Sequence, residues 1–305
     1  MVNQVGFIAL GNMGKSMAIN LLNAGFSLTV HDTREGPVEE LVGLGASAAA
    51  SPDAVARGSE VVWMMLHPAH VEEVLLGDSG VLRGAAPGTI VVDGGNCDPL
   101  VSQRYAAEAA QQGVTFLDAG CSGAPEGARE GTLAIMVGGD RDAFDTCLPI
   151  FHAVGKQATY FGKSGNGHMA KIINNIIIAM MTQAISEALT LATEAGLDPK
   201  RLLDTITTGA ARSWLLSQAN GIYHKPEQER YQPQFSDVAT ATAGGGDQVT
   251  WALRLAHELG LSLPMTGLTQ ELRKASASGG RTKVHRTMAQ LTYDYAGVRL
   301  DAPGT

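Results

Sequence analysis

Residues 6–25, GFIALGNMGKSMAINLLNAG, decide the fold of the first half of the chain. The apolar run Val5–Leu10 is typical of a buried strand, and Met13–Ala24 has the apolar spacing of an amphipathic helix. A glycine-rich turn connects the two. The sequence therefore predicts a strand, a tight turn and a helix in succession, which is the context required of a dinucleotide-binding fingerprint.

The turn departs in one position from the G-x-G-x-x-G pattern of such fingerprints, because Ala9 takes the place of the first glycine. Gly11 would let the backbone approach a pyrophosphate, and Gly14 would let the helix pack closely on the strand. The phosphates would then bind the amides at the amino end of the helix. A purely structural strand-to-helix turn is the alternative for the motif alone. The residues expected to contact the cofactor here are Leu10, Gly11, Asn12, Met13 and Gly14.

The second predicted strand ends at Asp32, about twenty residues after Gly11. A carboxylate at this position accepts hydrogen bonds from the adenosine ribose and repels a 2′-phosphate. Arg34 offers two alternatives, because it would either neutralise a 2′-phosphate or be a solvated turn residue. The sequence favours NAD as the cofactor, with NADP as the alternative.

Short apolar runs and helical patterns alternate through the first half of the chain, as in a sheet covered by helices on both faces. The other expected strands are Leu28–Val30, Val61–Leu66, Thr89–Val92, Val114–Leu117 and Ala134–Val137, and the helices between them include Pro37–Leu44, Pro52–Ala56 and Pro99–Gln112.

Strand signals stop after about Gly162, and Ala170–Ala195 is predicted as one long helix that is apolar nearly all round. We therefore expect an α/β Rossmann domain with a doubly wound, mostly parallel sheet over residues 1–163. An all-α domain follows over residues 164–305, joined to the first by the long helix. Its further helices are expected at Pro199–Thr207, Trp214–Gly221, Gln248–Leu259, Gly267–Ser278 and Val284–Tyr295.

The composition excludes several kinds of partner. The 305 residues carry 22 Lys plus Arg against 30 Asp plus Glu, a net charge of −8, and only 5% are aromatic, so nucleic acid and an anionic membrane are poor partners. Cys97, Cys121 and Cys147 lack the spacing of a disulfide framework or a zinc site, so we expect no metal and a cytoplasmic location. Asn174 and Asn175 interrupt the longest apolar segment, so we expect no membrane span.

The chain resembles the β-hydroxyacid dehydrogenases in five segments, which occur in that family's order and spacing. This group includes 3-hydroxyisobutyrate dehydrogenase, tartronate semialdehyde reductase and, more distantly, 6-phosphogluconate dehydrogenase. The resemblance runs from about Val5 to Ser217. It implies a Rossmann domain, a helical domain that carries substrate residues and the subunit interface, and reversible NAD(P)-linked oxidation of a hydroxyl group β to a carboxylate. The segments are GFIALGNMG (6–14), VVWMMLHP (61–68), DGGNCDP (93–99), DAGCSGAPEGAREGTLAIMVGG (118–139) and GKSGNGHMAKIINN (162–175).

Lys171 and Asn175 are four residues apart on the predicted long helix and so share one face. Oxidation of a carbinol needs a group that takes the hydroxyl proton, and the reverse reaction needs one that protonates the carbonyl. The resemblance implies that Lys171 is this catalytic group and that Asn175 orients the substrate. Because a lysine pKa of about 10.4 is too high for a base at neutral pH, the role requires desolvation or a nearby positive charge. The residues alone leave an exposed surface lysine as the alternative.

Ser122 and Gly123 follow a predicted strand, and the resemblance implies that they bind the substrate carboxylate; a Ser-Gly pair is otherwise a common turn. Ala124 stands where the family has a second glycine, so its methyl group is expected to reshape the substrate pocket. The resemblance also places Leu66 and Asn96 at the cofactor. Asn96 is closer to the 6-phosphogluconate branch, and a loop asparagine bonded to its own backbone is the alternative.

His168, Arg212 and Trp214 are further substrate-binding candidates by resemblance. His168 would contact the substrate or cap the entrance of the long helix, and Arg212 would supply a positive charge or be solvated. Most family members place a Lys-Asp pair near residues 240–250, where this chain reads TATAGGGDQVTW (240–251). Asp247 matches the aspartate of that pair, near the cofactor, but the lysine is absent.

The sequence thus predicts an NAD(P)-dependent oxidoreductase that interconverts a small 3-hydroxy acid and its carbonyl form, an aldehyde acid. Hydroxyisobutyrate, glycerate and related polyhydroxy acids are the expected substrates. An imine reductase on the same fold is one alternative, although that group usually has Asp or Tyr at the position of Lys171. A cofactor-binding interaction protein without catalysis is the other. The long apolar helix predicts a homodimer or homotetramer.

Overall fold

The structure of the chain is a computed structural model that describes residues 2–217 and 248–277. Its contacts divide it into two compact units, Met1–Ile172 and Ile173–Thr305. The predicted helix Val284–Tyr295 and the candidate Asp247 lie outside the described residues, as does the second half of Trp214–Gly221.

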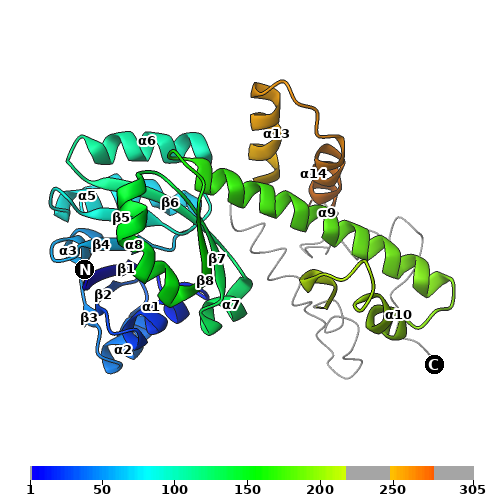
Figure 1. Cartoon of the computed structure of the whole chain (residues 1–305), viewed down its shortest axis with the longest axis horizontal. Helices are drawn as coiled ribbons and strands as arrows, with labels where there is room; N and C mark the ends of the chain where they lie inside the picture. Colours follow the sequence, from blue (N-terminus) through cyan, green and yellow to red (C-terminus); the bar gives the residue numbers. More distant parts are fainter. Residues whose placement is uncertain (1, 218–247, 278–305) are drawn as a thin grey trace. The chain divides into compact units, whose positions relative to one another are not determined.

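An eight-stranded sheet forms the centre of the first unit, in the order β3-β2-β1-β4-β5-β6-β7-β8 (Figure 1). All neighbouring strands are parallel except β6 and β7. β1 lies between β2 and β4, and the crevice at such a reversal of strand order is where doubly wound sheets bind ligands. The predicted Rossmann class is confirmed. The strands are β1 (Gln4–Ile8), β2 (Ser27–His31), β3 (Ser47–Ala48), β4 (Val61–Met64), β5 (Ile90–Asp93), β6 (Thr115–Ser122), β7 (Leu133–Gly138) and β8 (Gly155–Tyr160).

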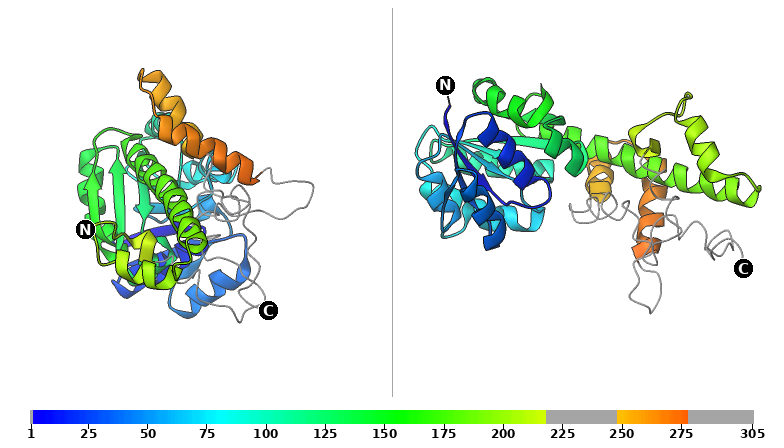
Figure 2. Two further views of the ribbon diagram at one scale, coloured as in Figure 1. Left: turned by 90° about the vertical axis from the view of Figure 1, so that its right-hand side faces the viewer. Right: turned by 90° about the horizontal axis from the view of Figure 1, so that it is seen from below.

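Helices cover both faces of the sheet (Figure 2). One face packs with α1 (Gly14–Asn23), α2 (Glu35–Gly43), α7 (Ala124–Glu130) and α8 (Arg141–Val154). The other packs with α3 (Pro52–Ala56), α4 (Pro68–Leu76), α5 (Val81–Gly84) and α6 (Pro99–Ala110). Every residue of β4 and β5 is buried, which explains why their sequences, VVWM and IVVD, are apolar up to the final aspartate.

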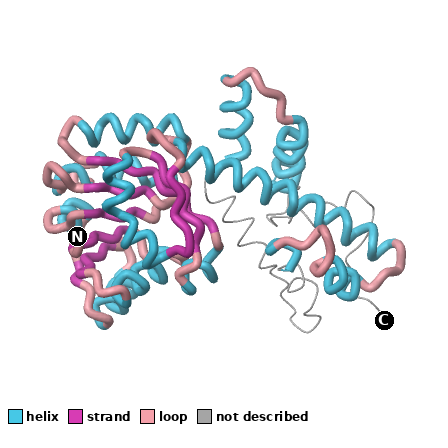
Figure 3. Tube along the Cα trace, in the orientation of Figure 1, coloured by secondary structure: helices cyan, strands magenta, loops and turns pink. Residues whose placement is uncertain are grey.

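Strands occur only in the first unit, and the described residues of the second contain helices and loops (Figure 3). The long helix α9 (Asn166–Glu194) begins in the first unit and continues into the second, where α10 (Pro199–Ile206), α13 (Gln248–Glu258) and α14 (Pro264–Ala277) follow. The prediction of a helical second half is therefore confirmed for the residues that the structure describes.

A single chain leaves part of the long apolar helix exposed. Ile173, Ile177 and Leu191 of α9 are 50%, 48% and 71% exposed. By length and composition alone, Asn166–Leu189 is apolar enough to cross a membrane despite its asparagines, a test that core helices of soluble proteins also pass. The first turns of α9 belong to the protein interior, because His168 and Lys171 are buried there.

Candidate active site

The glycine turn after β1 forms a cradle at the amino end of α1. Ala9 adopts a left-handed conformation with φ of 74°, which glycine accepts more readily, and its amide donates to the carbonyl of His31. A side chain on Gly14 would collide with the carbonyl oxygen of Ala9, whereas one on Gly11 would meet nothing within 4 Å. Gly14 therefore permits the close packing of α1 on β1, and Gly11 leaves open space above the turn.

The amino end of α1 is suited to an anion. Its first turn contains no acidic residue, and Met13 at the cap position offers no side-chain acceptor. Among the described residues, no hydrogen-bond acceptor is found for the amides of residues 11–14. Uncapped amides at a helix amino terminus bind phosphate. The turn thus fits the pyrophosphate of a dinucleotide at the positions that the sequence predicts.

Asp32 follows the end of β2, beside this turn. Its Oδ2 accepts from the amide of Leu10 at 2.6 Å, and its Oδ1 accepts from the amide and Nε of Arg34 at 2.9 and 3.0 Å. Burial works to raise the pKa of Asp32, but the hydrogen bonds from Arg34 and Leu10 outweigh it and hold that pKa below its usual value. The side chain of Arg34 is 59% exposed, and its guanidinium also donates to the carbonyl of Leu10. It therefore contacts the fingerprint turn rather than lying free in solvent.

Leu66 and Asn96 follow the neighbouring strands β4 and β5. A side chain on Gly95 would lie 2.6 Å from the carbonyl oxygen of Leu66, and one on Gly94 would collide with the indole of Trp63. The glycine pair therefore lets the loop after β5 lie directly on the end of β4. Asn96 is half-buried, and its buried Oδ1 has no hydrogen-bond partner among the described residues.

Asp118 of β6 fixes the entrance of α9. Its Oδ1 accepts from the amide of Gly165 at 2.7 Å, and its Oδ2 accepts from the amide of His168 at 2.9 Å. Any side chain on Gly167 would collide with the carbonyl oxygens of Asp118 and Met136. The carboxylate and this glycine hold the first turn of α9 against β6 and β7, which sets the position of Lys171.

Lys171 packs directly on β6. A side chain on Gly120 would lie 2.6 Å from its Cβ and 2.9 Å from its Cγ. Lys171 is 9% exposed, and burial lowers its pKa to about 8, against an opposing effect of the Cys121 thiol. No hydrogen bond or ion pair of its amine is found within the described residues. The structure thus supplies the desolvation that a lysine acid–base group requires.

Ser122 lies two residues after Gly120 on β6, so both face the same side of the strand about 7 Å apart. Lys171 packs on that side at Gly120, which brings the lysine near Ser122. Gly123 has φ of 144°, and Ala124 has φ of 58° in the left-handed region. Ala124 therefore occupies a backbone conformation that favours the glycine of the family pattern.

Asn175 lies one turn after Lys171 on α9 and is buried. Its amide Nδ2 donates to Oε1 of Gln248, at the start of α13, and its Oδ1 accepts from Asn174 at 2.8 Å. Gln248 directly follows Asp247, in the segment where the family lysine is missing. The sequence interpretation missed Gln248, although its place beside the TATAGGGD segment was a usable signal.

The three remaining substrate-binding candidates are His168, Arg212 and Trp214. His168 is wholly buried, with its Nδ1 2.7 Å from the hydroxyl of Ser102, while Asp118 caps the helix entrance. Arg212 and Trp214 are exposed residues of the second unit, and their contact with substrate stays a prediction.

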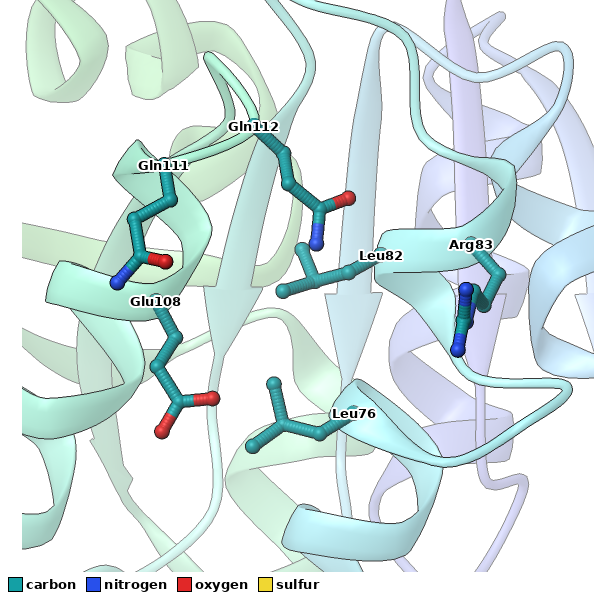
Figure 4. A pocket seen from close by; sticks show the side chains of 6 residues that line it. All are labelled: Leu76, Leu82, Arg83, Glu108, Gln111 and Gln112. Atoms are coloured by element: carbon teal, nitrogen blue, oxygen red, sulfur yellow. The ribbon is translucent and has the colours of Figure 1, made fainter.

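A cavity of about 260 Å³ lies among α4, α5 and α6 and is lined by two leucines and four polar residues (Figure 4). None of the candidate residues above lines it. Its lining consists of Leu76, Leu82, Arg83, Glu108, Gln111 and Gln112.

Comparison with known proteins matches two family models to the chain. One is described as the NAD binding domain of 6-phosphogluconate dehydrogenase and matches residues 4–162. The other is described as the NAD-binding domain of NADP-dependent 3-hydroxyisobutyrate dehydrogenase and matches residues 165–292.

Individual relatives match over most of their length. The chain is 38% identical to 2-hydroxy-3-oxopropionate reductase of Escherichia coli, covering 94% of this chain and 96% of the relative. It is 39% identical to NAD-dependent L-serine dehydrogenase of Pseudomonas aeruginosa, covering 72% and 74%. The solved structure of Mycobacterium tuberculosis 3-hydroxyisobutyrate dehydrogenase with L-serine superposes with a TM-score of 0.76 at 25% identity, covering 97% and 99%. This chain therefore belongs to the β-hydroxyacid dehydrogenase family.

Proposed function

We propose that the protein is an NAD(P)-dependent oxidoreductase that interconverts a small 3-hydroxy acid and its aldehyde acid, with Lys171 as the general acid–base. The observation that carries this proposal is the buried amine of Lys171, whose pKa is lowered to about 8 by desolvation. A group with a pKa near the working pH is the most effective in both directions of proton transfer.

The residues around Lys171 support each step assigned to the protein. In oxidation, neutral Lys171 takes the proton of the substrate hydroxyl; in reduction, its ammonium form donates a proton to the carbonyl oxygen. The nicotinamide of the cofactor, when bound, accepts or supplies the hydride. Gly120 and Asp118 fix where the amine stands, and the Asn175 amide, held by Gln248, lies one helical turn away to orient the substrate.

The substrate carboxylate is assigned to the Ser122–Gly123 turn. The compounds named for two relatives, 2-hydroxy-3-oxopropionate and L-serine, both carry oxygen on the carbon β to a carboxylate. Binding of the carboxylate at Ser122 would direct that β-carbon toward Lys171 on the same side of β6. The methyl group of Ala124 narrows this end of the site, which favours short substrates over long or branched ones.

NAD is the proposed cofactor, with NADP second. Asp32 keeps its negative charge at the position where the adenosine ribose binds, and a 2′-phosphate there would be repelled. The exposed side chain of Arg34, which pairs with Asp32, provides a cation that partly offsets that repulsion. A catalytic efficiency with NADP about tenfold above that with NAD would contradict this assignment.

The role of each domain and the oligomeric state are also proposals. The Rossmann domain, residues 1–163, binds the dinucleotide, and residues 164–305 contribute substrate residues and a subunit interface in a cytoplasmic homodimer or homotetramer. The exposed apolar residues Ile173, Ile177 and Leu191 of α9 support an interface, because a single chain leaves them in water. Sedimentation as a monomer would contradict it.

The test of the function is a substrate panel combined with a matched pair of lysine variants. The purified protein is assayed with NAD and NADP on 3-hydroxyisobutyrate, glycerate, threonate, serine and 6-phosphogluconate. Lys171→Ala should lower turnover by roughly 10²–10⁴-fold and leave NADH binding nearly unchanged, whereas the exposed Lys163→Ala should retain full activity. Turnover of Lys171→Ala within about threefold of the parent protein would overturn the proposal.

A further inference from the structure

Three buried side chains with metal-binding atoms meet at the carboxyl end of β5. Asp93 ends the strand, Cys97 lies in the loop after it, and His168 lies in the first turn of α9. One ligand atom from each lies within 4.8 Å of those from the other two. Asp93 and His168 are completely buried, and Cys97 is 5% exposed.

Two atoms of this cluster lack a partner. Among the described residues, no donor or acceptor reaches Oδ2 of Asp93 or Nε2 of His168. Buried polar atoms in folded proteins are nearly always paired with protein, water or an ion. An orphan carboxylate oxygen and an orphan imidazole nitrogen in one cluster therefore point to a ligand shared between them.

The neighbouring hydrogen bonds engage one polar atom of each side chain and leave the other available. Ser102 Oγ lies 3.1 Å from the carbonyl oxygen of Asp98 and 2.7 Å from Nδ1 of His168, so Nδ1 is the engaged nitrogen of the imidazole. Nε2 of His168 is the ring nitrogen that stays available to a ligand. Oδ1 of Asp93 is held by the amide of Gly95 at 3.1 Å, which leaves Oδ2 as the available oxygen.

A cation bound between Oδ2 of Asp93 and Nε2 of His168 would satisfy both orphan atoms at once. The other charged groups facing the cluster are committed elsewhere, since Asp118 accepts from two amides of α9 and Asp98 caps α6. The Cys97 sulfur completes a set of one nitrogen, one oxygen and one sulfur, which is the donor set of zinc. Ligating histidines characteristically hydrogen-bond through their other ring nitrogen, and Nδ1 of His168 lies 2.7 Å from the Ser102 hydroxyl.

We propose that Asp93, Cys97 and His168 form a binding site for Zn²⁺, with a fourth position left for water. The ion binds Cys97 as the thiolate, and the thiol proton is released to solvent. Metal–ligand bonds of about 2.0–2.3 Å place the ligand atoms about 3.3–3.8 Å apart, and the three atoms here already lie within 4.8 Å of one another. The site joins the loop after β5 to α9 and takes no part in proton transfer by Lys171.

The test uses the full-length protein, stripped with a chelator and then reconstituted with ZnCl₂ or CoCl₂. Plasma mass spectrometry after gel filtration should find about one zinc per chain, and zinc should raise the Tm by about 5 °C. The cobalt-loaded protein should show a thiolate-to-cobalt charge-transfer band in the near ultraviolet. Both signals should be lost in Cys97→Ser and His168→Gln.

Cys147→Ser is the matched control, because Cys147 is a fully buried cysteine in the core on the opposite face of the sheet. It should retain both the zinc and the cobalt band. Absence of stoichiometric metal in the reconstituted parent protein would overturn the proposal, as would zinc retained in both Cys97→Ser and His168→Gln. Where a variant fails to fold, the presence or absence of the cobalt band in the parent protein still supports or overturns the site.

Discussion

The substitution Gly120→Ala tests whether the packing of β6 sets the position of the Lys171 amine, the proposed acid–base group. Gly120 lies beneath the stem of Lys171, and the added methyl group would stand 2.6 Å from Cβ and 2.9 Å from Cγ of the lysine. Ordinary carbon–carbon contacts are about 3.5–4.0 Å, so the lysine stem or the strand must shift by roughly 1 Å. The backbone of Gly120 is not in the left-handed region, so the effect comes from this contact.

Such a displacement affects catalysis more than stability. Misplacing a reacting group by about 1 Å costs roughly 10²-fold in rate. Overpacking of a buried position lowers the free energy of unfolding by about 1–3 kcal/mol. We therefore expect kcat to fall by about 10²-fold in a protein that remains folded at 25 °C.

The assay measures kcat, the dissociation constant of NADH by fluorescence, and the Tm by calorimetry. Gly58→Ala is the matched control, because its methyl group would meet nothing within 4 Å. It should leave kcat unchanged. A Gly120→Ala protein that is folded, binds NADH and retains the parent kcat would refute the claim that this contact positions Lys171.

Three further substitutions test the backbone and the cofactor turn. Ala9→Gly should raise the free energy of unfolding by roughly 1 kcal/mol, since it relieves a left-handed alanine with φ of 74°; an unchanged denaturant midpoint would contradict this. Ala124→Gly should raise the free energy of unfolding by a similar amount, because Ala124 is also in the left-handed region. It should also widen the substrate site, so the KM for branched hydroxy acids should fall relative to the KM for glycerate. An unchanged ratio of these two KM values would count against Ala124 as a pocket residue. Arg34→Ala should raise the NAD-to-NADP ratio of kcat/KM by about tenfold or more, because it removes the cation beside Asp32; an unchanged ratio would exclude Arg34 from cofactor choice.

The sequence predicted the first β-α-β unit well because its signals are local. The apolar run, the glycine turn and the helical spacing lie within residues 5–24, and the structure has β1, the turn and α1 there. β8 was missed because it carries weak alternation, with most of Gly155–Tyr160 exposed or half-buried. α8 was also missed, although Phe144, Cys147 and Phe151 form a buried stripe; the helix contains Pro149, a residue that normally interrupts helices.

In the candidate site, too, the features carried by contiguous motifs could be predicted and those that depend on distant residues could not. Lys171 and Ser122 could be named as candidates because the motifs around them are contiguous in sequence. The contacts that position the lysine could not be, since Asp118 is 47 residues from the amide of Gly165 that it caps. The Asp93–Cys97–His168 cluster was invisible for the same reason, because no ligand spacing in the sequence connects Cys97 to His168.

The pH dependence of kcat/KM in both directions tests the central claim most directly. Burial lowers the pKa of Lys171 to about 8. The oxidation needs the neutral amine, so its kcat/KM should rise with pH and level off above about 8, and the reduction needs the ammonium form, so its kcat/KM should fall above the same pH. Lys171→Arg, which stays charged, should lose this inflection along with most of the activity. Profiles that are flat between about pH 7 and 9, or an inflection that persists in Lys171→Arg, would contradict the account.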